Sequence, residues 1–341
     1  MKIAQIGWAG NANQGDERMF YCIKRYFKKH EIVRFRNLLE AIQSIELVNS
    51  CDYVLIGGGG LIFRGFSRYV EFIKSIKKPL GCIGISIEAD NLNPDMEAGL
   101  SLLKKKCDFI YVRDQKSKKL LQNHYKVIVG PDLSFLYPFK PAVWKNKESC
   151  SLNLRNWSWW DQELYSSLDD IFTKLDRKFP WFFHLYPFEK WNSQDCVMRL
   201  NRLFKKVTPA PLYFGSYDKT DSDILSKYFK KVPNKFSPAI IADQRYLVGM
   251  RLHSLIFATQ MGIPFISLSY EPKNLNYCVE LGLPELSLDL KKYKQIEIKV
   301  KNLKDNGKII RTKLLEYTEN ATSRSHVLLD EIQRLMEKRR T

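Results

Sequence analysis

The feature that most constrains the fold is an alternation of short apolar runs with longer amphipathic stretches, which begins at the first residues. The apolar runs resemble buried strands in length, and the segments between them have the apolar spacing of helices. This alternation predicts a parallel sheet covered by helices on both faces. In the first part of the chain the expected strands are KIAQIG, EIVRFR, DYVLIGG, PLGCIGIS, FIYVRD and KVIVGPD.

The pattern lapses once, at residues 137–149, where a stretch rich in Pro and Lys is typical of a linker. A second series of apolar runs follows: SLNLRNW, WFFHLYP, APLYFG, YLVGMRL and PFISLSY. A chain of 341 residues is long enough for two domains. We therefore expect an α/β protein with two Rossmann-like domains, at 1–140 and 141–315, and a cleft between them. Residues 316–341 are expected to form a C-terminal helix that packs back on the first domain.

Composition and charge narrow the possible partners. Hydrophobic residues make up 45% of the chain, as in a folded globular protein. The formal net charge of +18 favours an anionic partner, which could be nucleic acid, anionic lipid or a small anionic substrate, or it reflects a solvated basic surface. The basic runs do not form a recognisable nucleic-acid module, so no specific nucleic acid is expected.

Cysteine usage and the N-terminus indicate a cytoplasmic protein. The seven cysteines are scattered, without a CxxC pair or a Cys/His cluster, and are expected to be buried free thiols in a reducing compartment. No zinc or other metal site is expected from this pattern. The N-terminus lacks the features of a secretory signal, and no apolar run approaches the length of a membrane span.

Two motifs lie at expected strand ends in the first series. The glycine run at residues 57–60 follows a strand and is expected to precede a turn, where Gly58 and Gly59 would serve either the turn itself or a ligand that approaches the backbone. Asn13 and Asp16 follow the first strand. Asp16 is expected at or near a helix N-terminus, either as a cap or as a carboxylate that binds a hydroxyl or removes its proton.

Three further side chains are weaker candidates. Arg113 ends one strand and is followed by Asp114, so it is either its ion-pair partner or an anion ligand. Arg155 is followed by Trp157, a combination that suits an anion beside a sugar-stacking surface or a cation–π contact in packing. His184 lies near a strand end in an apolar setting, which is more typical of a core histidine than of a catalytic one.

The strongest signal is RLHS, which contains Arg251 and His253 at an expected strand-to-helix turn. A helix N-terminus favours anions. Lys273 follows the next strand, and parallel neighbours would bring it to the same edge of the sheet. Together with Arg155, these residues predict a site for a small, highly anionic ligand.

These motifs resemble those of the polysaccharide pyruvyltransferase family over residues 3 to 280. The segments that carry the resemblance are NQGDE, IGGGGLI, YVRDQKS, GPDLSF, LNLRNW and, most specifically, RLHSLIFATQMGIPFISLSYEPK. Two positions depart from the family pattern. Ala12 stands where a glycine is usual, and Arg18 where a small residue is common.

The resemblance implies a GT-B-like pair of Rossmann-like domains and transfer of a pyruvyl group from phosphoenolpyruvate to two hydroxyls of a sugar. The product would be a cyclic pyruvate ketal in a surface polysaccharide precursor, with release of phosphate. Residues matching the family's donor-binding and catalytic positions are Arg155, Arg251, His253 and Lys273; Asp16 matches its acidic acceptor-side position. Either His253 or Lys273 could protonate the methylene carbon.

Further expectations about the acceptor and the cellular setting follow from the same resemblance. Acceptor contacts are expected from Asp16 and, more weakly, from Asn13, Gly58, Gly59, Arg113, Trp157 and His184. The acceptor is expected to be a lipid-linked oligosaccharide at the inner face of the membrane, which a basic protein could reach by peripheral contact with anionic lipid. No cofactor or metal is expected, because side chains supply the cations.

Two alternatives stay open at this point. A GT-B-type glycosyltransferase with a nucleotide-sugar donor would share the fold, because fold does not determine function. A nucleic-acid-binding protein without enzymatic activity would also explain the charge, and would bind with strong salt dependence.

Overall fold

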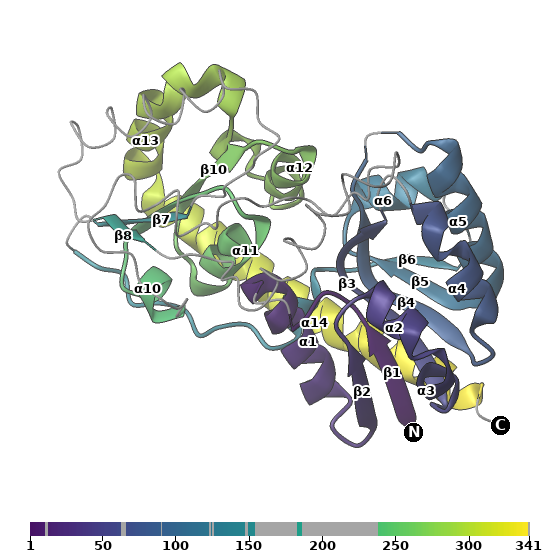
Figure 1. Cartoon of the computed structure of the whole chain (residues 1–341). Coiled ribbons are helices and arrows are strands. Elements are labelled where there is room, and N and C mark those ends of the chain that lie inside the picture. Colours follow the sequence, from purple (N-terminus) through teal and green to yellow (C-terminus); the bar gives the residue numbers. More distant parts are fainter. Residues whose placement is uncertain are drawn as a thin grey trace, which may run out of the picture. The chain divides into compact units, whose positions relative to one another are not determined.

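A computed structural model describes residues 1–10, 13–62, 66–89, 91–122, 124, 126–146, 149–153, 183–185 and 238–339 (Figure 1). The chain divides into two compact units. The first contains residues 1–10, 15–138 and 316–341, and the second is built mainly from residues 139–315. Each unit has its own sheet.

The described strands of the first unit form a parallel sheet in the order β2-β1-β3-β4-β5-β6. The apolar runs of the sequence therefore form strands, as predicted. The bounds are β1 Lys2–Ile6, β2 Glu31–Phe35, β3 Tyr53–Ile62, β4 Leu80–Ile87, β5 Cys107–Val112 and β6 Val127–Val129.

Alternate residues of a strand point to opposite faces of the sheet. Both sets are apolar here, so helices cover both faces. Tyr53 and Leu55 of β3 pack on the side of α1 and α14, whereas Val54 and Ile56 pack on the side of α2, α4 and α5. The helical elements that follow the strands are α1 Gln14–Tyr26, α2 Leu38–Gln43, α3 Ile45–Asn49, η1 Phe66–Tyr69, α4 Val70–Ser75, α5 Pro94–Lys106, α6 Gln115–Leu120 and η2 Leu133–Leu136.

The C-terminal helix α14, Gly307–Lys338, begins in the second unit and belongs to the first from Glu316 onward. Its buried side chains Leu329, Ile332 and Met336 join the core that α1 forms with the sheet. This half of α14 therefore serves as a covering helix of the first sheet.

The described strands of the second unit are also parallel, in the order β11-β10-β9-β7-β8. Four of them were predicted from the sequence. The fifth, β11, was not, and the expected strand at 210–215 lies outside the described residues. The bounds are β7 Cys150–Asn153, β8 Phe183–Leu185, β9 Tyr246–Gly249, β10 Phe265–Ser269 and β11 Ser287–Asp289.

The helices of the second unit follow the same alternation. They are α10 Pro238–Ala242, α11 Leu252–Met261, α12 Pro272–Glu280, η3 Pro284–Leu286, η4 Leu290–Gln295 and α13 Ile296–Asp305. The α11 helix is buried on nearly every side, which explains why its sequence is almost uniformly apolar. Within the described residues, every helix is too short or too polar to span a bilayer.

The described cysteines, Cys22, Cys51, Cys82, Cys107, Cys150 and Cys278, are free and buried. The prediction of buried free thiols is therefore confirmed for these six, while Cys196 lies outside the described residues. Burial raises the pKa of Cys22 to about 11 and the pKa values of Cys150 and Cys278 to about 12. Because the thiolate is the reactive form, these thiols should be inert in the folded protein.

We predict that a thiol reagent at neutral pH modifies none of these six cysteines in the native protein on the timescale of minutes, and all of them after denaturation. Mass spectrometry of labelled peptides would locate the modified residues. Rapid native labelling of Cys150 or Cys278 would contradict the packing described for the second unit.

Candidate functional site

The loop between β9 and α11 in the second unit places two of the predicted residues. Arg251 is the N-terminal cap residue of α11, is 6% exposed and leaves the first turn without a side-chain cap. His253 lies in that first turn. This placement is as predicted: an arginine and a histidine lie at the start of a helix, and both the side-chain charge and the helix N-terminus favour an anion.

Asparagine side chains hold this loop from two neighbouring elements. Asn153, at the end of β7, accepts a hydrogen bond from the Arg251 amide at 3.1 Å and its own carbonyl accepts one from Met250 at 2.9 Å. Asn274, in the first turn of α12, donates to the Met250 carbonyl at 2.6 Å. Both asparagines are fully buried. The backbone of Arg251 is therefore positioned by β7 and by α12.

Lys273 lies in the first turn of α12, which follows β10. Because β9 and β10 are parallel neighbours, with Gly249 opposite Ser267, their carboxyl ends lie at one edge of the sheet. The Lys273 ammonium forms an ion pair with Glu271 at 2.6 Å, and both side chains are about a quarter exposed, at 26% and 22%. The sequence analysis missed Glu271, although it stands beside Pro272 at the start of the same helix. An anionic ligand would compete with this carboxylate for the lysine.

The remaining candidates of the second series are less defined. Arg155 and Trp157 lie outside the described residues. His184 is part of β8, where its backbone pairs with Ser151 of β7. Its predicted role therefore stays a prediction, as do those of Arg155 and Trp157.

In the first unit, the glycine run does not precede a turn as expected. β3 continues through it to Ile62, with an irregular register between Gly59 and Ile62. The strand continues because glycine allows β4 to approach: a Cβ at Gly57 would lie only 1.8 Å from the Ile83 carbonyl oxygen. Gly58 and Gly59 have φ angles of +85° and +125°, a region that side chains disfavour.

Two carboxylates lie against this glycine backbone. A Cβ at Gly59 would lie 2.8 Å from Asp16 Oδ1, and one at Gly60 would lie 2.0 Å from Glu88 Oε1. Asp16 is 8% exposed and lies within the first turn of α1, so it is near the helix start as expected. Asn13 directly precedes α1. Glu88 follows β4, and the sequence analysis missed it because nothing in ISIEAD distinguishes it from a surface residue.

The two departures from the family pattern lie around the start of α1. Ala12 lies outside the described residues. Arg18 donates a hydrogen bond to the Tyr137 carbonyl and places its guanidinium 5.0 Å from the centre of the Tyr21 ring. Arg18 thus packs within the first unit, which gives its larger side chain a structural role.

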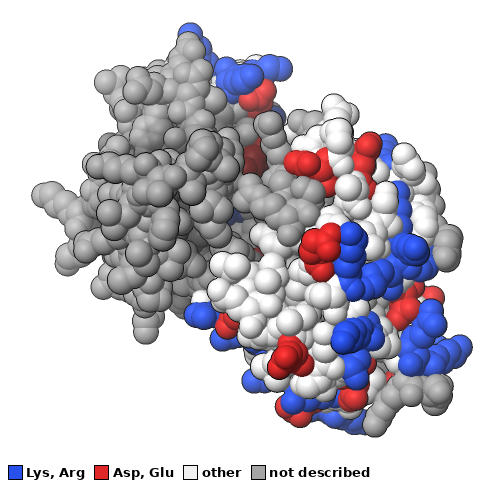
Figure 2. Space-filling model, turned by 45° about the vertical axis from the view of Figure 1, so that its right-hand side comes forward, with Lys and Arg blue, Asp and Glu red and all other residues white. Residues whose placement is uncertain are grey.

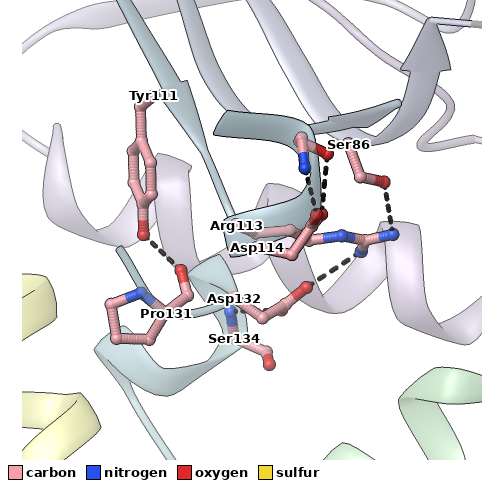
Figure 3. Close-up of polar contacts among 8 residues, drawn as sticks. Ser86, Tyr111, Arg113, Asp114, Pro131, Asp132 and Ser134 are labelled. Atoms are coloured by element: carbon pink, nitrogen blue, oxygen red, sulfur yellow. Dashed lines mark hydrogen bonds and ion pairs between the residues drawn. The ribbon is translucent and has the colours of Figure 1, made fainter. Parts of the chain in front are cut away.

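Arg113 takes part in a buried polar network at the ends of β4, β5 and β6 (Figure 3). Its guanidinium donates to Asp132 at 3.0 Å and to Ser86 at 2.9 Å. Asp114 caps α6 by accepting from the Ser117 amide at 2.7 Å. Burial by itself would lower the pKa of Arg113, but the nearby Asp132 and Asp114 carboxylates outweigh it, so the pKa is raised.

The structure thus groups the predicted residues in two sets. Arg251, His253 and Lys273 share the carboxyl edge of the second sheet. In the first unit, Gly58 and Gly59 lie in the carboxyl-terminal half of β3, and Asp16 of α1 lies beside Gly59. Arg113 directly follows β5, and its buried ion pair supports a structural role beside the predicted acceptor contact.

Solved structures similar to this one define the class of fold. A UDP-GlcNAc 2-epimerase from Neisseria meningitidis is 13% identical and aligns over 98% of this chain and 100% of that chain with a TM-score of 0.57. Alr3699/HepE from Anabaena, solved in complex with UDP and glucose, is 12% identical over 99% and 100% of the two chains with a TM-score of 0.59. At these identities the similarity establishes the fold: a GT-B-like α/β protein with two Rossmann-like domains.

The family model for polysaccharide pyruvyl transferase matches residues 10–272, which is more than half of the chain. The chain belongs to the polysaccharide pyruvyl transferase family, which confirms the resemblance seen in the motifs. A short stretch is also 37% identical over 51 residues to the amylovoran biosynthesis protein AmsJ of Erwinia amylovora, covering 15% of this chain and 12% of that protein.

We predict that the Arg113–Asp132 pair is important for the stability of the first unit. Replacing Arg113 by Met leaves Asp132 buried without its cation, and breaking a buried pair in this way costs about 3–5 kcal/mol. Equilibrium denaturation would measure the loss. The matched control is Lys74→Met, which removes an ion pair with Glu71 whose side chains are 56% and 81% exposed and should cost at most about 1 kcal/mol. Equal losses in the two variants would contradict the structural role assigned to Arg113.

Proposed function

We propose that the protein transfers a pyruvyl group from phosphoenolpyruvate to two hydroxyls of one sugar in a surface polysaccharide precursor. The products are a cyclic pyruvate ketal and inorganic phosphate. The observation that carries this proposal is membership of the polysaccharide pyruvyl transferase family across residues 10–272. The cationic edge of the second sheet supports it independently.

The donor needs several cations at one place. Phosphoenolpyruvate combines a carboxylate with a phosphate group that carries a charge of about −1.5 to −2 near neutral pH. Arg251, His253 and Lys273 are brought to one strand edge, beside the starts of α11 and α12. Arg155, by its match to the family motif, is the fourth donor-binding residue. In this proposal the arginines hold the phosphate and the carboxylate.

The reaction balances with side chains as the proton carriers. A proton moves from His253 or Lys273 to the methylene carbon of phosphoenolpyruvate, and positive charge develops at the adjacent carbon. The oxygen of one hydroxyl bonds to that carbon, and the carbon–oxygen bond to phosphate breaks. The second hydroxyl then closes the ring. One hydroxyl proton replaces the proton that the side chain gave to carbon. The other hydroxyl proton protonates the departing phosphate.

His253 suits proton transfer because the charge of histidine changes near neutral pH. Lys273 suits the phosphate side, where its charge would offset that of the leaving group. Binding of phosphate there would separate Lys273 from Glu271, its partner at 2.6 Å in the present structure.

The acceptor side is assigned to the carboxyl-terminal half of β3 and the start of α1. Asp16 is the proposed base for the first hydroxyl, and Gly58 and Gly59 are proposed as backbone contacts of the sugar. Asn13, Arg113, Trp157 and His184 are proposed as weaker acceptor contacts. A lipid-linked oligosaccharide is the proposed acceptor class.

The experiment that tests this function compares donors. The protein is incubated with acceptor glycans and either phosphoenolpyruvate or UDP-GlcNAc, and the products are followed by phosphate or nucleotide release and by mass spectrometry. Phosphate release together with a pyruvate ketal on the glycan supports the proposal. Release of UDP with transfer of the sugar would instead identify a nucleotide-sugar glycosyltransferase.

We predict that Arg251→Ala lowers turnover by about 10²- to 10³-fold, as expected for loss of a charge that stabilises the transition state. His253→Asn should lower it by about 10²-fold or more if the imidazole transfers the proton. Initial rates of phosphate release would measure both, with thermal melting as a check on folding.

The matched control is Arg245→Ala. Arg245 lies at the other end of β9, where it donates to the Asn146 carbonyl and contacts Trp144. It should keep turnover within about threefold, because it lies far along the strand from the proposed donor edge. Variants at Arg251 and His253 that melt normally and turn over like the control would assign RLHS a purely structural role.

We also predict that two substitutions in the glycine run distinguish the effect of backbone strain from the effect of displacing the Asp16 carboxylate. Gly58→Ala and Gly59→Ala should each cost about 1–2 kcal/mol of stability, because both residues have positive φ. Only the Gly59 variant also pushes the Asp16 carboxylate, since the added Cβ would lie 2.8 Å from it, whereas the Gly58 Cβ would have its nearest contact at 3.8 Å. Turnover at saturating donor should therefore be roughly tenfold lower in Gly59→Ala than in Gly58→Ala. Equal turnover would remove Asp16 from the proposed mechanism.

A further inference from the structure

One surface of the second unit combines positive charge with exposed aliphatic side chains. Residues 290–313, which form η4, α13 and the start of α14, contain nine Lys or Arg against two acidic residues. Ile298 and Ile309 are 63% and 60% exposed within this segment. We call it the α13–α14 surface. Its exposed basic and aliphatic members are Lys291, Lys292, Lys294, Ile298, Lys301, Lys308, Ile309 and Lys313.

The α13–α14 surface is more uniformly positive than the described face of the first unit shown in Figure 2. On that face, Asp and Glu side chains lie between groups of Lys and Arg. On the α13–α14 surface the two acidic residues, Glu297 and Asp305, are outnumbered more than fourfold. This local excess provides a specific place for an anionic partner.

A groove of about 360 Å³ opens next to the exposed isoleucine of α14. Ile266, Leu283 and Leu303 contribute apolar side chains to its lining, and Ile309 extends the lining outward. Polar residues of the lining include Glu285, Asn302, Asn306, Lys299 and Lys313. Lys299 donates to the Glu285 carbonyl at 2.6 Å, so Lys313 is the exposed cation of the lining.

Aliphatic side chains surrounded by lysines fit a lipid surface better than a nucleic acid. Single-stranded nucleic acids are bound by basic grooves whose aromatic side chains stack on bases, and the exposed apolar residues here are isoleucines. At a bilayer the same arrangement buries the aliphatic side chains among the acyl chains while lysines contact lipid phosphates. Basic residues near an anionic bilayer contribute about 1 kcal/mol each.

We propose that the α13–α14 surface docks the protein on an anionic bilayer. Ile298 and Ile309 enter the interface, Lys301, Lys308 and Lys313 contact lipid phosphates, and the groove accommodates the apolar part of an adjacent lipid. None of these residues is assigned to donor or acceptor binding. Membrane docking can therefore be disproved while the proposed function holds, and the proposed function can be disproved while docking holds.

The test is vesicle flotation of the full-length protein. Wild type should float with phosphatidylcholine vesicles that contain phosphatidylglycerol, remain unbound with pure phosphatidylcholine, and be released by salt, because screening weakens exposed charges. Lys301→Glu with Lys308→Glu should weaken anionic vesicle binding by at least about 30-fold, which corresponds to about 2 kcal/mol for two lysines. Ile309→Ser should weaken it roughly tenfold.

Matched controls separate this surface from the net charge of the chain. Lys28→Glu with Lys29→Glu makes the same change in charge in the first unit, and Val327→Ser replaces a residue of α14 that is 69% exposed in the first unit. Both should bind vesicles within about twofold of wild type. Melting temperatures and phosphate release with a water-soluble acceptor should be unchanged in all variants.

Three outcomes would overturn the proposal. The first is failure of the wild type to float with anionic vesicles at low salt. The second is a loss of binding in the control pair as large as that in the Lys301 and Lys308 pair. The third is loss of binding to duplex DNA or single-stranded RNA in Lys301→Glu with Lys308→Glu while vesicle binding persists. The last result would assign the surface to nucleic acid.

Discussion

Parallel strand pairing is the constraint on which the rest of the structure depends. Every described pair in both sheets is parallel. Each strand must then return through a connection on a face of the sheet, and all strands of a sheet end at one edge. Loops that are distant in sequence meet there. The grouping of Arg251, His253 and Lys273 follows from this constraint, since β9 and β10 are neighbours.

Hydrogen bonds from buried side chains then hold these loops. In the second unit, Asn153 and Asn274 bind the backbone on either side of the Met250–Arg251 peptide. In the first, the Arg113–Asp132 pair joins the ends of β5 and β6. A buried polar group that loses its partner costs about 1–3 kcal/mol, so these contacts maintain a single loop conformation. A fixed loop lets the cations act without reorganisation when an anionic donor binds.

The sequence predicted the fold well because burial on both faces produces long apolar strands that local patterns reveal. It also predicted that Arg251 and His253 begin a helix. It failed where the decisive contact is distant in sequence. The glycine run reads locally as a turn, but β4 keeps it in the sheet. Arg113 precedes Asp114, yet its partner is Asp132, which reaches it only after β6 is added to the sheet. Glu271 and Glu88 look like surface residues until the fold places them beside Lys273 and Gly60.

The central claim is that the carboxyl ends of β9 and β10 bind the anionic donor. A crystal structure of the protein with phosphoenolpyruvate tests it most directly. The account predicts that the phosphate and carboxylate lie within hydrogen-bonding distance of Arg251, His253 and Lys273, with the lysine moved away from Glu271. Phosphoenolpyruvate bound elsewhere, with the Lys273–Glu271 pair intact, would contradict it.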